Sequence, residues 1–96
     1  MDAFSFDTDK LIEICRANDA AMVGVFGSVA RGEDTSASDI DIMVKFSRRK
    51  ILLDIVKIER ELSTVLGKKV DLLTEAAISP YLRDRILGEL QVIYEN

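Results

Sequence analysis

The sequence predicts an α/β fold, with a small mixed sheet flanked by helices. A continuous apolar run at residues 21–26 is typical of a buried strand. Two further strand-like segments, residues 39–46 and 69–74, lie on either side of an amphipathic helix at residues 51–66. That helix has the length that a crossover between parallel strands needs. Strands that alternate with helices, without an internal repeat or a linker, indicate one domain over residues 1–96.

Shorter elements surround the first strand. Residues 1–6 are expected to be a loose lead-in. Residues 7–9 offer N-cap side chains, and the apolar stripe behind them predicts a helix to about Ala17. Residues 28–32 have the composition of a short helical turn, and residues 33–37 form a polar loop.

Glycine and proline mark the C-terminal part. Gly67 is a natural residue to follow the long helix. Ser79 and Pro80 begin a last helix, Gly88 is expected to end it, and residues 90–94 are expected to form a final strand. The apolar side of the last helix consists of Tyr81, Leu82, Ile86 and Leu87. Where this side or the last strand is exposed, it would suit a homo-oligomer or a contact with a partner protein.

Two carboxylates in the strand at residues 39–46 are unusual, because strands are depleted in aspartate. Side chains at positions i and i+2 of a strand point to the same face, so Asp39 and Asp41 should stand side by side. Adjacent like charges repel, and a divalent cation between them is the usual remedy. The alternative is an edge strand that its charges protect from pairing with other chains.

Gly27 and Ser28 follow directly after the first apolar strand. A glycine at the end of a strand lets the backbone approach a ligand closely. The free N–H groups of the next turn and the Ser28 hydroxyl would face an incoming anion. An ordinary strand-ending turn is the alternative. Carboxylates beside an anion-binding turn describe a site for a metal-bound polyphosphate.

These motifs resemble a known family. The sequence GS at residues 27–28, followed after a ten-residue gap by Asp39-x-Asp41, resembles the signature of the DNA polymerase beta-type nucleotidyltransferase superfamily. The longer segments GSVARG at residues 27–32 and SDID at residues 38–41 resemble the minimal nucleotidyltransferases. These small proteins are often paired with a HEPN-domain partner as a toxin–antitoxin system.

The resemblance implies the polymerase beta-type nucleotidyltransferase fold and a metal-dependent site. Asp39 and Asp41 would be catalytic and would bind two Mg²⁺ ions. The third carboxylate of the family fits Asp71, which would complete the ion that activates the acceptor and could take the acceptor's proton. From the residues alone, Asp71 could also be a solvent-facing position in a half-buried strand.

The nucleotide-binding residues implied by the resemblance are Gly27, Ser28 and Arg31, with ATP as the substrate. Gly27 and Ser28 would hold the β- and γ-phosphates. Arg31 either adds positive charge there or pairs with Glu33 or Asp34 on the surface, and the residues alone favour neither.

The resemblance implies a magnesium-dependent transfer of AMP from ATP to a hydroxyl, that of a tyrosine of a HEPN toxin, so that the chain would act as an antitoxin. Larger superfamily members carry extra domains that hold their substrates, so a partner is expected to present the acceptor here. One alternative is a binding module that neutralises a HEPN partner sterically. Another is a transferase that acts on a small molecule or on a nucleic-acid end.

Composition excludes several other functions. The net charge of −4 and the pI of about 4.8 argue against direct nucleic-acid binding, which usually leaves a basic footprint. The chain has no histidine, which excludes Ser-His triads, His-ligated zinc and histidine bases. No apolar run approaches the ~20 residues of a membrane span.

Two smaller features complete the sequence. Cys15 is the single cysteine, so no intrachain disulfide can form, and a reducing cytoplasm is the expected compartment. The residue itself is expected to be a buried hydrophobe. The basic triplet Arg48, Arg49 and Lys50 precedes the long helix. It is expected either to be a solvated helix start or to face phosphate.

Overall fold

A computed structural model describes residue 4, residues 6–33, residue 35 and residues 37–96. The expectations for residues 1–6 and 33–37 therefore lie partly outside the described residues, as does a pairing of Arg31 with Asp34.

The helices and strands follow the predicted order. They are α1 (Thr8–Ala17), β1 (Ala20–Phe26), α2 (Gly27–Arg31), β2 (Ile40–Phe46), α3 (Leu52–Leu66), β3 (Val70–Thr74), the short 3-10 helix η1 (Glu75–Ala77), α4 (Pro80–Glu89) and β4 (Gln91–Glu95). η1 is the one element without a sequence prediction. Within the described ranges, none of these helices combines the length and the apolar character that a membrane crossing requires.

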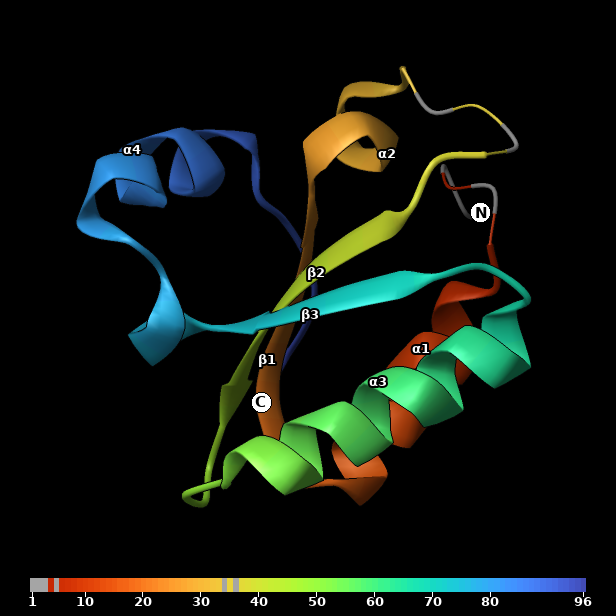
Figure 1. Cartoon of the computed structure of the whole chain (residues 1–96), viewed down its shortest axis with the longest axis vertical. Coiled ribbons are helices and arrows are strands. Elements are labelled where there is room, and N and C mark those ends of the chain that lie inside the picture. Colours follow the sequence, from red (N-terminus) through yellow and green to blue (C-terminus); the bar gives the residue numbers. More distant parts are fainter. Residues whose placement is uncertain (1–3, 5, 34, 36) are drawn as a thin grey trace.

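The four strands form one mixed sheet in the order β3-β2-β1-β4. β2 and β3 are parallel and are connected by α3, whereas β1 is antiparallel to both β2 and β4 (Figure 1). β2 therefore lies inside the sheet, with a partner on each side. The interpretation of Asp39 and Asp41 as charges that protect an edge strand is wrong, because β2 has no free edge.

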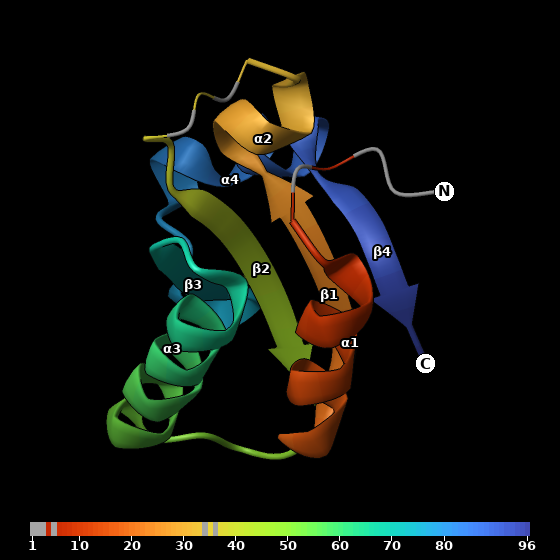
Figure 2. The ribbon, with the colours of Figure 1, turned by 90° about the vertical axis from the view of Figure 1, so that its right-hand side faces the viewer.

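The main hydrophobic core lies on the face of the sheet that α1 and α3 cover, and Figure 2 shows these two helices in front of the strands. Ile40, Ile42 and Val44 of β2 point into it, and the Cys15 thiol is fully buried there. Burial raises the pKa of Cys15 to about 12, with a smaller contribution from Glu61. The expectation of a buried, unreactive cysteine is confirmed.

The opposite face carries a smaller core beneath α4. It consists of Met22, Phe26, Met43, Ile78 and Ile86. Because side chains alternate along a strand, Asp41 and Lys45 share this face with Met43. Asp41, one of the predicted site carboxylates, therefore lies on the less covered side of the sheet.

Helix α4 differs from its prediction in two respects. Gly88 does not end the helix, which continues to Glu89 before Leu90 turns into the extended backbone that leads to β4. Glycine inside a helix costs only about 1 kcal/mol, which tertiary contacts can offset. Ile86 is the one buried residue of the predicted apolar side. The other three are exposed, most of all Tyr81, which is 96% accessible.

The predicted helix caps are present. The Lys10 N–H donates to Asp7 Oδ1 over 3.1 Å at the start of α1. Gly67 ends α3 in the left-handed conformation, with φ = 71°. Ser79 caps α4, since its hydroxyl accepts from the Tyr81 N–H.

A pair of leucine substitutions in α3 tests this packing. Leu62 is fully buried in the main core, whereas Leu53 on the same helix is 57% exposed. We expect Leu62→Ala to lower the free energy of unfolding by about 2–5 kcal/mol, because it leaves a cavity. Leu53→Ala should change it by no more than about 0.5 kcal/mol. Urea denaturation measures both, and equal losses would contradict this arrangement of α3.

Candidate active site

Asp41 and Asp71 stand next to each other on the parallel strands β2 and β3. Their Cα atoms are register partners, so both carboxylates point to the same face. Asp39 lies two residues before Asp41, just outside β2. The Ile40 N–H donates to the Lys69 carbonyl over 2.9 Å, which places Asp39 beside the start of β3. The structure thus brings the three predicted carboxylates to one end of the strand pair.

Helix α3 fixes the position of β3. The N–H groups of Val70 and Leu72 point away from β2, and they donate to Ser63 Oγ (3.0 Å) and Glu59 Oε2 (2.8 Å). These bonds satisfy the outer edge of β3 and hold its register. Asp71 lies between the two donors, and this register keeps it the partner of Asp41 on β2.

A lysine lies between two of the carboxylates. Lys69 Nζ is 3.9 Å from Asp39 Oδ2 and also 3.9 Å from Asp71 Oδ1. The Lys69 side chain is 70% exposed, so little packing holds it there. Among the described residues, no three acidic or other metal-binding side chains close around one point as metal ligands do. The three carboxylates lie near one another, and the positive charge between Asp39 and Asp71 is the ammonium group of Lys69.

The carboxyl group of Asp41 is perturbed by its surroundings. Burial raises its pKa, and repulsion from Asp71 and then from Asp39 adds to the rise. Ionisation of Asp41 therefore costs more in the folded chain than it does in water. This is the electrostatic state expected of a site that binds a cation.

Gly27 joins the turn to the carboxylates. It has φ = 76°, a left-handed conformation, and its neighbour Phe26 is the register partner of Asp41 across β1 and β2. A Cβ atom at Gly27 would overlap the Asp41 carboxylate and lie 3.1 Å from its Cγ. Only glycine allows the backbone to come this close. The turn and Asp41 are parts of a single site.

A hollow of about 400 Å³ lies over this junction. Its lining includes the predicted residues Gly27, Ser28, Arg31 and Asp41, together with Arg85 and Glu89 of α4. Asp39 and Asp71 are not among the described residues of its lining, but Asp71 is the register partner of Asp41, and Asp39 lies two residues before Asp41. All six predicted site residues are thus close together at one end of the sheet.

Glu89 is a site residue that sequence reasoning missed. The Gly27 N–H donates to Glu89 Oε2 over 3.2 Å, and Arg31 Nη1 donates to Glu89 Oε1 over 2.9 Å. A carboxylate of the protein thus occupies the donors that were predicted to hold an anion. The expectation that Gly88 ends α4 hid this residue. Its spacing of four residues from Arg85, with which it pairs at 3.6 Å, is the signal that could have found it.

Arg31 forms the surface pair predicted for it and a second, unpredicted pair inside the hollow. Its Nε lies 3.4 Å from Glu33 Oε2, which is the predicted surface pair. Its Nη1 points into the hollow and binds Glu89. Desolvation alone would raise the pKa of Glu89, but the hydrogen bonds from Arg31 and Gly27 outweigh it and lower that pKa below the ordinary value.

Comparisons with known proteins place this geometry in context. A family model described as a nucleotidyltransferase domain matches residues 8–93. The chain is 49% identical over 80 residues to MJ0435 of Methanocaldococcus jannaschii, a candidate protein adenylyltransferase by name. That match covers 83% of this chain and 86% of the relative.

Solved structures show the same fold. A toxin–antitoxin structure with AMP-PNP matches with a TM-score of 0.86 and 23% identity, over 94% of this chain and 74% of the other. A complex of a tri-AMPylated Shewanella oneidensis HEPN toxin with an MNT antitoxin matches with a TM-score of 0.75 and 21% identity, over 92% and 69% of the two chains.

The raised pKa of Asp41 predicts a pH-dependent gain from Asp41→Asn. The pKa of Asp41 is higher in the folded chain than its ordinary value of 3.8. This difference stabilises the folded chain fully below pH 3.8, and the stabilisation is lost as the pH rises through the folded-state pKa. At pH 7 without metal, Asp41→Asn should therefore melt at the same temperature as the wild type or higher. The gain should shrink as pH falls towards 3.8. Thermal melts in EDTA measure this, and a variant that melts much lower at pH 7 would contradict it.

The contact between Gly27 and Asp41 is tested against a second glycine. Gly27 and Gly32 share nearly the same φ, but a Cβ at Gly32 meets nothing within 4 Å. Gly32→Ala should cost only the left-handed strain of about 1–2 kcal/mol. Gly27→Ala should cost clearly more, because Asp41 must also move. Urea denaturation compares the two, and equal losses would show that the turn does not rest on Asp41.

Proposed function

The chain belongs to the nucleotidyltransferase domain family, and we propose that it is a protein adenylyltransferase that transfers AMP from ATP to a hydroxyl of a partner protein. The observation that carries the proposal is the packing of the Gly27 turn directly on Asp41, with Asp71 alongside on the next strand. This packing supports a site in which an anion-binding turn lies against paired carboxylates, as transfer from a triphosphate needs.

The phosphates would bind at the turn. The Gly27 N–H, the Ser28 hydroxyl and the Arg31 guanidinium would hold the β- and γ-phosphates, in the place where Glu89 now accepts hydrogen bonds. Glu89 would release these donors when the triphosphate arrives. Phosphate oxygens carry more negative charge than one carboxylate, so the exchange favours the nucleotide.

The chemical step exchanges one phosphorus–oxygen bond for another. The acceptor hydroxyl forms a bond to the α-phosphorus, and the bond from that phosphorus to the oxygen bridging to the β-phosphate breaks, so that pyrophosphate leaves. Asp71 is the candidate to take the hydroxyl proton. The fixed turn would hold the leaving pyrophosphate in line with the attacking oxygen.

Asp39, Asp41 and Asp71 would hold magnesium as two ions. Carboxylate oxygens suit this ion, and the Lys69 ammonium between Asp39 and Asp71 supports a place for positive charge. When bound, magnesium would supply charge stabilisation for the attacking and leaving oxygens. The raised pKa of Asp41 supports the same assignment, since a nearby cation would favour the charged form of this carboxyl group.

The proposed acceptor is a tyrosine of a HEPN-domain toxin, which AMP transfer would silence. The sequence motifs at residues 27–32 and 38–41 support this partner by resemblance. The name of MJ0435 supports a protein as the acceptor. The fold shared with the MNT antitoxin, which is known in complex with a tri-AMPylated HEPN toxin, is consistent with it.

Transfer of label tests the proposal. The chain is incubated with magnesium, α-labelled ATP and the HEPN protein encoded by the neighbouring gene. The wild type should label that protein, and Asp41→Asn or Asp71→Asn should reduce the rate roughly 100-fold or more. Asp84→Asn on the exposed side of α4 is the matched control and should retain full activity.

Three other outcomes would overturn the proposal. A stable complex that never becomes labelled would favour a binding module. Label on a small molecule or on a nucleic-acid end would favour another kind of transferase. Full labelling by Asp41→Asn would place the chemistry elsewhere.

A further inference from the structure

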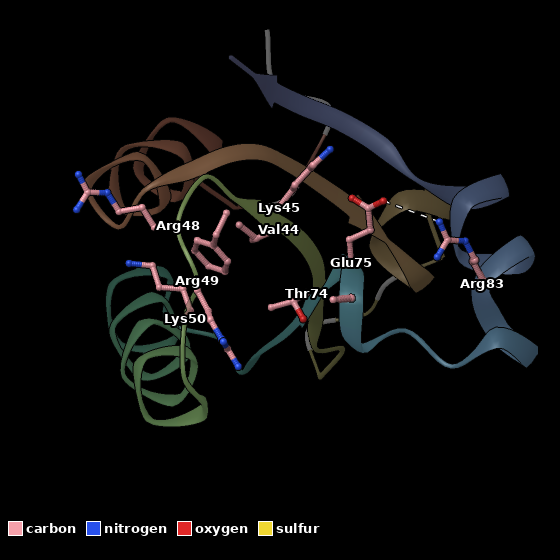
Figure 3. Close-up of a pocket in the computed structure, with 10 residues that line it drawn as sticks. Val44, Lys45, Arg48, Arg49, Lys50, Thr74, Glu75 and Arg83 are labelled. Atoms are coloured by element: carbon pink, nitrogen blue, oxygen red, sulfur yellow. Dashed lines mark ion pairs between the residues drawn. The ribbon is translucent and has the colours of Figure 1, made fainter.

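A second hollow, of about 550 Å³, lies at the other end of the parallel strand pair. It is larger than the hollow over Gly27, and it opens where β2 and β3 end. Figure 3 shows Arg48, Arg49 and Lys50 on one side of it, with Glu75 and Arg83 on the other. Lys45 is four residues along β2 from Asp41, ~13 Å at strand spacing, and it projects from the same sheet face. This hollow is therefore separate from the candidate active site but opens beside the same strands.

Positive charge gathers in this second hollow. Five of the 13 lysine and arginine side chains line it, namely Lys45, Arg48, Arg49, Lys50 and Arg83, although the whole chain has a net charge of −4. Glu75 is the one acidic residue in the lining, and its carboxylate lies 3.9 Å from Arg83. Such a concentration of one charge on an acidic protein attracts the opposite charge.

Several of these charges are not neutralised. Lys50 pairs with Asp19 over 2.9 Å. Within the part of the chain that the structure describes, Lys45 and Arg49 form no ion pair, and both are exposed. Cationic side chains from β2, the following turn and α4 border the same hollow, and Figure 3 shows the charged ends of Arg48 and Lys50 directed outward from it. A border of cations drawn from three elements is more than a solvated helix start requires, and it favours a binding role.

The rest of the lining is apolar or small. Val44, Phe46 and Ala76 lie between the charged side chains. Ile51 and Leu52 follow the basic triplet directly in the chain, and their side chains are 61% and 79% exposed. Apolar surface bordered by cations suits a peptide that presents both acidic and apolar side chains.

The same features disfavour nucleic acid as the occupant. Single-stranded nucleic acid binds aromatic faces and a long basic groove. Phe46, the one aromatic residue of the lining, is half-buried, and Lys50 Nζ lies 5.7 Å from its ring centroid. The five cations of the lining form a cluster around one hollow and not a long groove, and the net charge of the chain is negative.

We propose that this basic hollow is a docking site for an acidic segment of the protein that accepts AMP. It would hold the acceptor protein away from the chemistry while the acceptor hydroxyl enters the hollow over Gly27 and Asp41. The identity of the occupant rests on the proposed function, whereas the affinity of the hollow for acidic peptide does not.

Charge reversal tests the docking role. In Arg48→Glu/Arg49→Glu, the KM for the HEPN protein should rise roughly tenfold or more, and the KM for ATP should stay unchanged. The matched control is Lys57→Glu/Arg60→Glu on the exposed side of α3, which changes the net charge equally and should leave both constants unchanged. Equal effects of the two double variants, or none from the first, would overturn the docking site.

A direct binding experiment separates this proposal from the proposed function. Poly-L-glutamate is titrated into the isotope-labelled chain, and amide chemical shifts are followed by nuclear magnetic resonance. We expect shifts at residues 45–50 and 74–76, which weaken as salt rises and disappear in Arg48→Glu/Arg49→Glu. An oligothymidylate that shifts these amides while poly-L-glutamate does not would overturn the proposal in favour of nucleic acid. Absence of AMP transfer with these shifts intact would refute the proposed function alone.

Discussion

The site depends on the missing side chain of Gly27. β1 delivers this residue directly beside Asp41 of β2, because Phe26 and Asp41 are register partners. A Cβ atom there would overlap the Asp41 carboxylate, so the turn and the strand can meet only through glycine. The strand order β3-β2-β1 then places Asp71 on the other side of Asp41. One close backbone approach therefore joins an anion-binding turn to a carboxylate pair.

Each half of this site holds a protein group with the charge of the ligand that it is proposed to bind. The Lys69 ammonium stands among the carboxylates, and the Glu89 carboxylate accepts from Gly27 and Arg31 at the turn. Neither charge is deeply buried, so each can be replaced without breaking the core. This arrangement keeps the charged groups satisfied in the unliganded chain. Asp41 is the exception, because burial and then repulsion from Asp71 and Asp39 raise its pKa.

Local patterns in the sequence predicted the features that neighbouring residues determine. They missed the features that depend on contacts between residues far apart in the sequence. The alternation along β2 predicted that Asp39 and Asp41 share a face, and the family spacing predicted Gly27 and Asp71. Sequence spacing alone does not place β2 inside the sheet, because its neighbours β1 and β3 come from separate parts of the chain. Glu89 was missed for the same reason, as its partners lie 58 and 62 residues away. The basic hollow combines a triplet seen in the sequence with Lys45 and with Arg83 of α4, which the fold brings together.

Paramagnetic broadening would test the central claim, that turn and carboxylates form one metal–nucleotide site, most directly. Mn²⁺ takes oxygen ligands as Mg²⁺ does, and it can be added in trace amounts with AMP-PNP to the isotope-labelled chain. The account predicts that the amide signals of Gly27, Asp41 and Asp71 broaden first, while those of residues 45–50 persist. Broadening centred on residues 45–50, or equal broadening in Asp41→Asn, would contradict it.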